Sequence, residues 1–212
     1  MGEEHKIARA AAVIGGATFI SRILGFIRDM IVARGFGASS AADAFYVSYR
    51  IPNLLREMFA EGSMSAAFIP VFTEYTTKRS KEETIRLAHA SFTIILLILS
   101  GISIIGMIFA PTIVSLIAPG FVSEAEKANM TILMTRIMFP FLLFVGIAAQ
   151  AMGILNSLRS FAAPAMAPAM FNIVIIASTL IISPMLDRPI LGVAIGVLLG
   201  GLVQFLYQVP SL

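Results

Sequence analysis

The stretch "GATFISRILGFIRDMIVARGFG", Gly16 to Gly37, is apolar and long enough to cross a membrane, yet it contains Arg22, Arg28 and Asp29. A membrane-spanning α-helix needs about 20 mainly apolar residues. Charged side chains inside such a helix are rare, because hydrocarbon offers no water to solvate them. The placement of these three charges therefore decides which way the helix can face.

The composition of the whole chain indicates a membrane protein. Of its 212 residues, 58% are hydrophobic and 13% are charged, and the mean hydropathy is +0.92. Soluble domains average about 25% charged residues. The lack of cysteine excludes a disulfide framework and thiolate metal sites. Most basic residues lie in or beside apolar runs, which favours membrane topology over nucleic-acid binding despite a pI near 9.5.

Six apolar segments, each close to the length of a membrane span, predict an all-α, polytopic membrane bundle of six transmembrane helices. The helices are expected at about 7–34, 42–75, 86–117, 127–155, 163–182 and 190–207 of one domain, residues 1–212. The first run continues through Arg22 without a convincing signal-peptide cleavage site, so we interpret it as a retained helix. Small residues recur at Gly192, Gly196 and Gly200 of the last segment, which predicts close helix packing.

The loops differ in their content of Lys and Arg, and this difference predicts the orientation of the chain. One set comprises Lys6, Arg9, Lys78, Arg79, Lys81, Arg86 and Arg159, and the opposite set comprises Arg34, Lys127 and Arg188. The side richer in Lys and Arg is normally cytoplasmic. We therefore expect a multi-pass protein with both termini in the cytoplasm.

A helical projection of the first segment separates its polar residues from its apolar ones. At 100° per residue, the polar arc covers about 120°, and large apolar side chains occupy the opposite arc. The polar arc contains Thr18, Ser21, Arg22, Gly25, Arg28 and Asp29. The apolar arc suits lipid or packed helices, whereas the polar arc requires polar neighbours.

The second segment repeats this division. Four charged residues, Asp43, Arg50, Glu57 and Glu61, fall within about 40° on the same projection, and Asn53 and Arg56 flank them on one side. Pro52 is expected to kink this helix, because proline lacks an N–H for the backbone ladder. Two neighbouring helices thus both carry charges at membrane depth.

Two interpretations of these charges remain open. An Arg that faces lipid near the bilayer centre costs about 2.5–3.5 kcal/mol on the insertion scale, so Arg22, Arg28 and Arg56 need a wet cavity or partners. In the first interpretation, nearby Asp and Glu residues neutralise the arginines and the network only joins helices. In the second, the arginines bind an anionic ligand, for which the planar guanidinium group offers bidentate donors.

Sequence motifs favour the second interpretation. Ser21 to Tyr75 contains the runs "SR-LGF-RD", "DAF", "PNLLR", "AEG" and "AFIPVF-EY" in order, and "APGF", "GILN" and "PA-AP---N" follow. This pattern closely resembles the MurJ (MviN) family of bacterial lipid II flippases, in the multidrug/oligosaccharidyl-lipid/polysaccharide exporter superfamily. The resemblance covers essentially the whole chain.

The resemblance implies a fold and a function. Family members have two six-helix lobes around a central cavity, followed by two further helices. This chain matches the N-terminal lobe, and the C-terminal lobe is absent from it. The implied function is the movement of lipid II, an undecaprenyl-pyrophosphate-linked disaccharide-pentapeptide, to the outer leaflet of the bacterial cytoplasmic (inner) membrane by alternating access. The implied partners are lipid II, membrane lipids and the missing lobe, with no nucleic acid.

The resemblance also implies site residues. The cavity arginines of the family fall at Arg22, Arg28 and Arg56. Other polar positions of the same motifs match Ser21, Asp29, Asp43, Asn53 and Glu61. Glu57 departs from the family pattern, in which a basic residue often follows "LLR", and this lowers the local positive potential. No cofactor is expected in this lobe, and sodium or membrane-potential coupling would belong to the full-length protein.

Three other functions compete with this prediction. The first is the export of drugs or of another polyprenyl-linked saccharide, although arginines favour an anionic substrate over cationic drugs. The second is a non-transporting membrane scaffold for cell-wall assembly, in which the charges are structural. The third is an intramembrane enzyme, which the sequence disfavours because it shows no metal-ligand cluster, phosphate-cradling loop or nucleophile–base spacing. We therefore expect a transporter rather than an enzyme.

Overall fold

The computed structural model describes residues 3–58, 64–121 and 123–212, and the regular elements in these ranges are helices. The α-helices are α1 (Glu3–Phe36), α2 (Ser40–Arg56), α3 (Met64–Lys78), α4 (Lys81–Ile108), α5 (Ala110–Ile117), α6 (Ala125–Met138), α7 (Phe141–Ser157), α8 (Ala162–Ile181) and α9 (Ile190–Leu206). Short 3-10 turns are η2 (Pro119–Phe121), η3 (Ser183–Met185) and η4 (Val209–Ser211).

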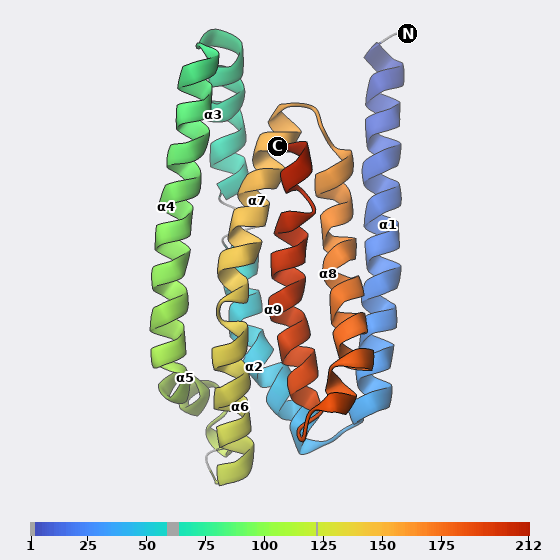
Figure 1. The fold of residues 1–212 in the computed structure, drawn as a ribbon, viewed down its shortest axis with the longest axis vertical. Coiled ribbons are helices and arrows are strands. Elements are labelled where there is room, and N and C mark those ends of the chain that lie inside the picture. Colours follow the sequence, from blue (N-terminus) through green and yellow to red (C-terminus); the bar gives the residue numbers. More distant parts are fainter. Residues whose placement is uncertain (1–2, 59–63, 122) are drawn as a thin grey trace.

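The helices form an elongated bundle in which the chain runs back and forth along one axis. Helices α1 and α4 lie at opposite flanks, and α9 lies between α7 and α8 (Figure 1). Helix α1 packs mainly against α8, while α4 packs mainly against α7. The start of α1 and the C-terminus lie toward the same end of the bundle (Figure 1). The cytoplasmic location of that end stays a prediction.

The predicted all-α membrane fold is confirmed. Five helical stretches within the described residues are long and apolar enough to cross a membrane: 11–36, 81–108, 125–157, 162–185 and 190–211. The predicted second helix, 42–75, corresponds to α2 and α3 on either side of residues 59–63, which lie outside the described residues. The other predicted helices agree with the structure to within a few residues, apart from two internal breaks and an earlier start for the first and third.

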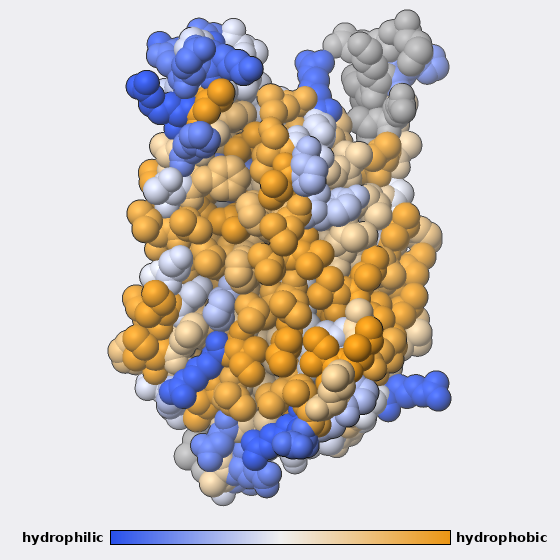
Figure 2. Space-filling view, in the orientation of Figure 1, coloured by the Kyte–Doolittle hydropathy of each residue, from blue (hydrophilic) through white to orange (hydrophobic). Residues whose placement is uncertain are grey.

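The surface of the bundle also fits a bilayer. A broad apolar belt covers the middle of the molecule, and hydrophilic residues gather toward its two ends (Figure 2). Large side chains such as Phe26, Leu97 and Ile105 are more than half exposed. Soluble monomers rarely expose apolar patches of more than a few hundred Å². The belt is therefore the surface that lipid would cover.

The third and fourth predicted helices are each broken, and proline is the physical reason. Pro111 and Pro140 lie at the breaks, where a missing N–H leaves a carbonyl without its helical partner. In a continuous helix, an N–H at position 111 would donate to the Met107 carbonyl, and Pro111 has none. The Arg136 Nε atom donates to this carbonyl instead, at 3.1 Å. The segment predicted over 86–117 is thus divided into α4 and α5, and the one over 127–155 into α6 and α7, although residues 125–157 still form one candidate membrane span.

The helix ends follow from local sequence. Helix α1 ends at "GFG" because Gly37 adopts a positive φ of 56°, and its N–H donates to the Ala33 carbonyl at 2.8 Å. Helix α4 begins with a capping box, in which Ser80 and Glu83 satisfy each other's backbone N–H groups. These local signals fix where α1 ends and where α4 begins.

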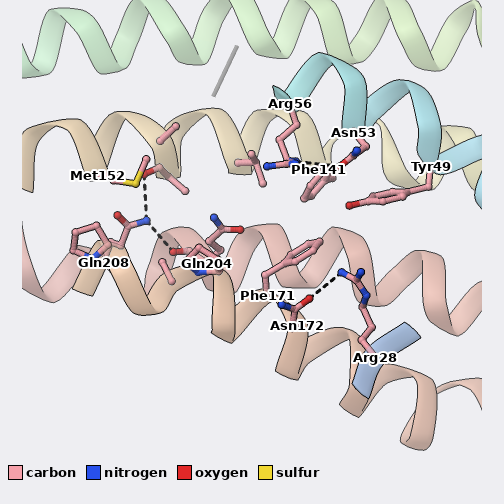
Figure 3. A pocket seen from close by; sticks show the side chains of 16 residues that line it. Arg28, Tyr49, Asn53, Arg56, Phe141, Met152, Phe171, Asn172, Gln204 and Gln208 are labelled. Carbon is pink, nitrogen blue, oxygen red and sulfur yellow. Dashed lines mark hydrogen bonds between the residues drawn. The ribbon is translucent and has the colours of Figure 1, made fainter. Parts of the chain in front are cut away.

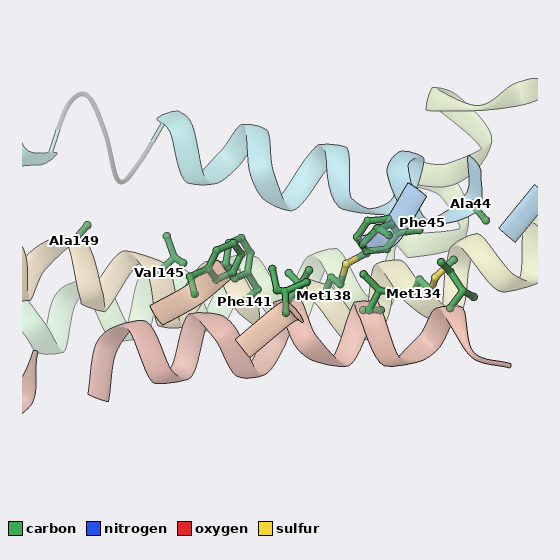
Figure 4. Packing of buried hydrophobic residues seen from close by; sticks show 14 residues of the cluster. Ala44, Phe45, Met134, Met138, Phe141, Val145 and Ala149 are labelled. Carbon is green, nitrogen blue, oxygen red and sulfur yellow. The ribbon is translucent and has the colours of Figure 1, made fainter. Parts of the chain in front are cut away.

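The core lies where α9 crosses α2, α6, α7 and α8. Its fourteen buried apolar residues include Phe45, Met138, Phe141 and Val193 (Figure 4). The close approach of α9 to α8 requires glycine: a Cβ atom on Gly196 would lie 2.8 Å from Ser178 Cβ and 3.2 Å from Ile175 Cα. The predicted small-residue packing face is thus confirmed.

We expect Gly196→Ala to destabilise the protein by about 1–3 kcal/mol, because the added methyl group overpacks the α8–α9 contact. The measurement is the thermal unfolding midpoint of the purified protein in detergent. Gly101→Ala is the matched control, because a Cβ atom there meets no atom within 4 Å. Equal midpoints for the two variants would contradict the close-packing interpretation.

Candidate functional site

A cavity of about 380 Å³ lies between α1, α2, α7, α8 and the end of α9. Its volume is in the range of small-molecule sites, about 300–1,000 Å³. The lining residues are Arg28, Tyr49, Asn53, Arg56, Phe141, Val145, Ala148, Ala149, Met152, Pro164, Ala167, Pro168, Phe171, Asn172, Gln204 and Gln208. Many of these side chains are small, so the helices meet here without filling the space between them.

Arg28 reaches the cavity from α1 and is held by α8. Its Nη1 atom donates to Asn172 Oδ1 at 2.8 Å, as Figure 3 shows. The Asn172 Nδ2 atom donates in turn to the Ser21 backbone carbonyl at 3.0 Å. Gly25 leaves room for this amide, since a Cβ atom there would lie 3.6 Å from Asn172 Nδ2. Asn172 therefore joins the side chain of Arg28 and the backbone of α1 to α8.

Arg56 reaches the cavity from α2 and is oriented within its own helix. The Arg56 Nε atom donates to Asn53 Oδ1 at 3.1 Å, and Asn53 Nδ2 donates to Glu57 Oε1 at 2.9 Å. Tyr49 lies on the same face of α2, four residues before Asn53, and also lines the cavity (Figure 3). One face of α2 thus presents Tyr49, Asn53 and Arg56 together.

The carboxylates beside these arginines lie further out. Asp29 Oδ1 is 2.8 Å from Arg28 Nη2, and Glu57 Oε1 is 3.7 Å from Arg56 Nη2. Each arginine side chain is 25% exposed, whereas Asp29 is 62% and Glu57 is 55% exposed. Both arginines line the cavity and neither carboxylate does. Because solvent screens exposed charges more than buried ones, these two carboxylates offset the arginines only in part.

Aromatic rings close the cavity beside the core. The Tyr49 ring stacks on Phe45 with centroids 5.9 Å apart, and Phe141 lies 5.3 Å from Phe171. Tyr49 and Phe141 also meet, at 6.1 Å. Tyr49, Phe141 and Phe171 all line the cavity, so its wall there is aromatic.

The structure brings together only some of the site residues predicted from sequence. Arg28, Asn53 and Arg56 share the cavity. Arg22 is exposed on α1 and lies outside the cavity lining. Ser21 is half-buried and takes part through its backbone carbonyl.

The two described acidic residues of the prediction lie outside the cavity lining: Asp29 is beside it, and Asp43 is far from it. Asp29 pairs with Arg28 and lines a small adjoining pocket of about 40 Å³. Asp43 lies in the first turn of α2, where its Oδ2 atom accepts from Lys127 Nζ at 2.9 Å. Asp43 therefore ties α2 to α6 at the end of the bundle remote from the chain termini (Figure 1). Glu61 lies outside the described residues.

Sequence reasoning missed four polar lining residues: Tyr49, Asn172, Gln204 and Gln208. The i, i+4, i+7 spacing of Tyr49, Asn53 and Arg56 is a signal that could have found the first. The charged residues that cluster on the projection of this segment lie elsewhere: Asp43, Arg50 and Glu57 are exposed. Gln204 could have been found as the polar side chain in the otherwise apolar segment 190–206.

We expect Asn172→Ala to destabilise the protein by about 1–3 kcal/mol, because it removes both the acceptor for Arg28 and the donor to the Ser21 carbonyl. Thermal unfolding in detergent measures the loss. Asn129→Ala is the matched control, since Asn129 is exposed on α6. A variant at position 172 that unfolds at the wild-type temperature would show that the amide bridge does not hold α1 to α8.

Comparison with known proteins assigns the chain to a family. The family model described as "Lipid II flippase MurJ" matches residues 32–212. The lipid II flippase MurJ of Burkholderia cenocepacia is 39% identical over 204 residues, which cover 96% of this chain and 40% of that protein. The probable lipid II flippase MurJ of Vibrio cholerae is 38% identical, covering 98% and 41% respectively.

A solved structure agrees with the fold. The structure titled "Lipid II flippase MurJ, inward closed conformation" superposes with a TM-score of 0.78 at 31% sequence identity. The match covers 94% of this chain and 41% of that chain. This chain thus spans about 40% of the length of the curated relatives that it matches. With the family model matching residues 32–212, the chain is a multi-pass membrane protein that belongs to the MurJ lipid II flippase family.

Proposed function

We propose that the protein moves lipid II across the bacterial cytoplasmic membrane, with the described cavity forming part of the headgroup site. The undecaprenyl chain would stay in lipid, while the pyrophosphate–disaccharide–pentapeptide headgroup enters a space lined by arginine. Rocking of this lobe against a second lobe would then expose the headgroup on the other side by alternating access. The termini would face the cytoplasm, as the loop charges predict.

One observation carries this proposal: guanidinium groups from α1 and α2 line the same cavity, while Asp29 and Glu57 lie outside its lining. Guanidinium is the side chain best suited to phosphate, because its fork stays charged and donates two parallel hydrogen bonds. The Arg28 group already makes hydrogen bonds to Asp29 and Asn172. A phosphate oxygen could exchange with the Asp29 carboxylate, which would make binding reversible enough for release.

The proposed cycle needs no covalent chemistry and no cofactor in this lobe. The two positively charged side chains supply attraction, and the protein supplies two access states. Coupling to sodium or to the membrane potential would involve the remainder of the full-length protein. A membrane scaffold for cell-wall assembly, or an exporter of a different polyprenyl-linked saccharide, is separated from this proposal by the experiments below.

We expect Arg28→Ala and Arg56→Ala in the full-length protein to slow lipid II translocation at least tenfold, because a hydrogen bond to a charged group contributes about 1.5–3 kcal/mol. The same loss is expected for Arg22→Ala, which the family resemblance supports and the cavity lining of this chain does not. The measurement is lipid II flipping in reconstituted vesicles, together with complementation of flippase-depleted cells.

Arg34→Ala is the matched control, because Arg34 is exposed at the end of the same helix as Arg28. The control should flip lipid II at the wild-type rate. Arg28→Lys and Arg56→Lys test whether bidentate hydrogen bonding is required, since lysine keeps the positive charge but cannot form the bidentate pair. Normal flipping by both alanine variants at wild-type abundance would refute the arginine-lined headgroup site. Normal flipping of a different polyprenyl-linked saccharide, without lipid II, would favour the alternative exporter.

A further inference from the structure

The cavity has an uncharged polar end that the arginines do not explain. Gln204, Gln208 and Met152 lie together at one end, whereas Arg28, Arg56 and Tyr49 lie toward the other (Figure 3). The lining runs from Pro164 to Asn172 on α8 and from Phe141 to Met152 on α7. At 1.5 Å per residue, these stretches measure about 12 Å and about 16 Å. The cavity therefore extends well beyond the reach of a phosphate contact at its arginine end.

Gln204 is an exception in its own helix. Helix α9, Ile190–Leu206, has 17 residues, and all of them except Gln204 are apolar or glycine. An amide placed in a transmembrane helix usually faces protein or water, because hydrocarbon cannot satisfy its hydrogen bonds. The Gln204 side chain is half-buried and lines the cavity, and it makes no hydrogen bond to any residue that the structure describes.

Gln208 builds the wall behind it. Gln208 is 1% exposed, and its Nε2 atom donates to the Ala148 carbonyl at 3.2 Å and to the Gln204 carbonyl at 3.1 Å. These two bonds fix the amide orientation and tie the end of α9 to α7. The Gln208 Oε1 atom is buried without a hydrogen-bond partner among the described residues. This end of the cavity therefore has an oriented Gln208 amide beside the Gln204 amide, and both have hydrogen-bonding atoms without partners among the described residues.

We propose that Gln204 determines specificity by hydrogen-bonding to an uncharged amide or hydroxyl group of the ligand, while Arg28 and Arg56 bind its phosphates. This inference rests on the proposed function, and it names the part of the headgroup, sugar or peptide, that the amide end of the cavity contacts. A primary amide suits this task because it both donates and accepts hydrogen bonds. A site built to pair with such a group discriminates against a ligand that lacks it.

The experiment compares two lipids that share the same anion. Lipid II carries the pyrophosphate with the disaccharide and peptide, whereas undecaprenyl pyrophosphate carries the pyrophosphate without them. We expect Gln204→Leu to reduce the affinity ratio of lipid II to undecaprenyl pyrophosphate by about three- to tenfold, the range of one hydrogen bond. Affinities are measured by competition binding to the full-length protein in detergent. Leucine should be tolerated structurally, because α9 is otherwise apolar.

Two controls separate the possible failures. Gln150→Leu removes an amide that pairs with Ser91 at 2.8 Å between α7 and α4, outside the cavity lining, so the affinity ratio should stay at the wild-type value. Arg56→Ala should weaken binding of both lipids. An unchanged ratio for Gln204→Leu, with both lipids weakened by Arg56→Ala, would overturn the inference and leave the proposed function standing. Unweakened binding of both lipids to Arg56→Ala would overturn the proposed function.

Discussion

The cost of placing a guanidinium group in hydrocarbon is the constraint on which the rest of the structure depends. Helix α1 meets it for Arg28 by packing one side of its polar arc, with Ser21, Gly25 and Arg28, against Asn172 of α8. Its large apolar side chains, such as Phe19 and Phe26, point outward and are 66% and 64% exposed. This arrangement is the reverse of that in a soluble bundle. It is stable in a bilayer because lipid tails are as apolar as the side chains they touch.

The cavity exists because neighbouring helices are held apart at one level and packed closely at another. Alanine and proline side chains of α7 and α8 leave space around Arg28 and Arg56. About one and two turns before the cavity-lining Gln204 of α9, Gly200 and Gly196 bring the backbone of α9 against Phe171 and Ser178 of α8. Tight packing supplies the attraction that hydrocarbon solvent does not. The same bundle can therefore be rigid at its core and open at its site.

The sequence predicted the arginine end of the cavity and missed its amide end. Arg28, Asn53 and Arg56 could be predicted from the sequence because they are polar or charged residues in apolar segments. Asn172 was not, since its function depends on Arg28, which is 144 positions away. Asp43 was grouped with Arg50 and Glu57 by its phase on the α2 projection and with the site residues by the family resemblance, yet its partner is Lys127 of α6. A helical projection describes one helix and cannot name the neighbour of each face.

By itself, the sequence determined that this protein is a helical membrane bundle, where most of its helices lie, and which arc of α1 is polar. These properties are local, because hydropathy and the 3.6-residue period depend on residues a few positions apart. Only the tertiary structure decided that Arg28 and Arg56 share a cavity with Asn172, Gln204 and Gln208 while Arg22 lies outside its lining. That choice depends on how α1, α2, α7, α8 and α9 pack together, and on the prolines and glycines that set their breaks and separations.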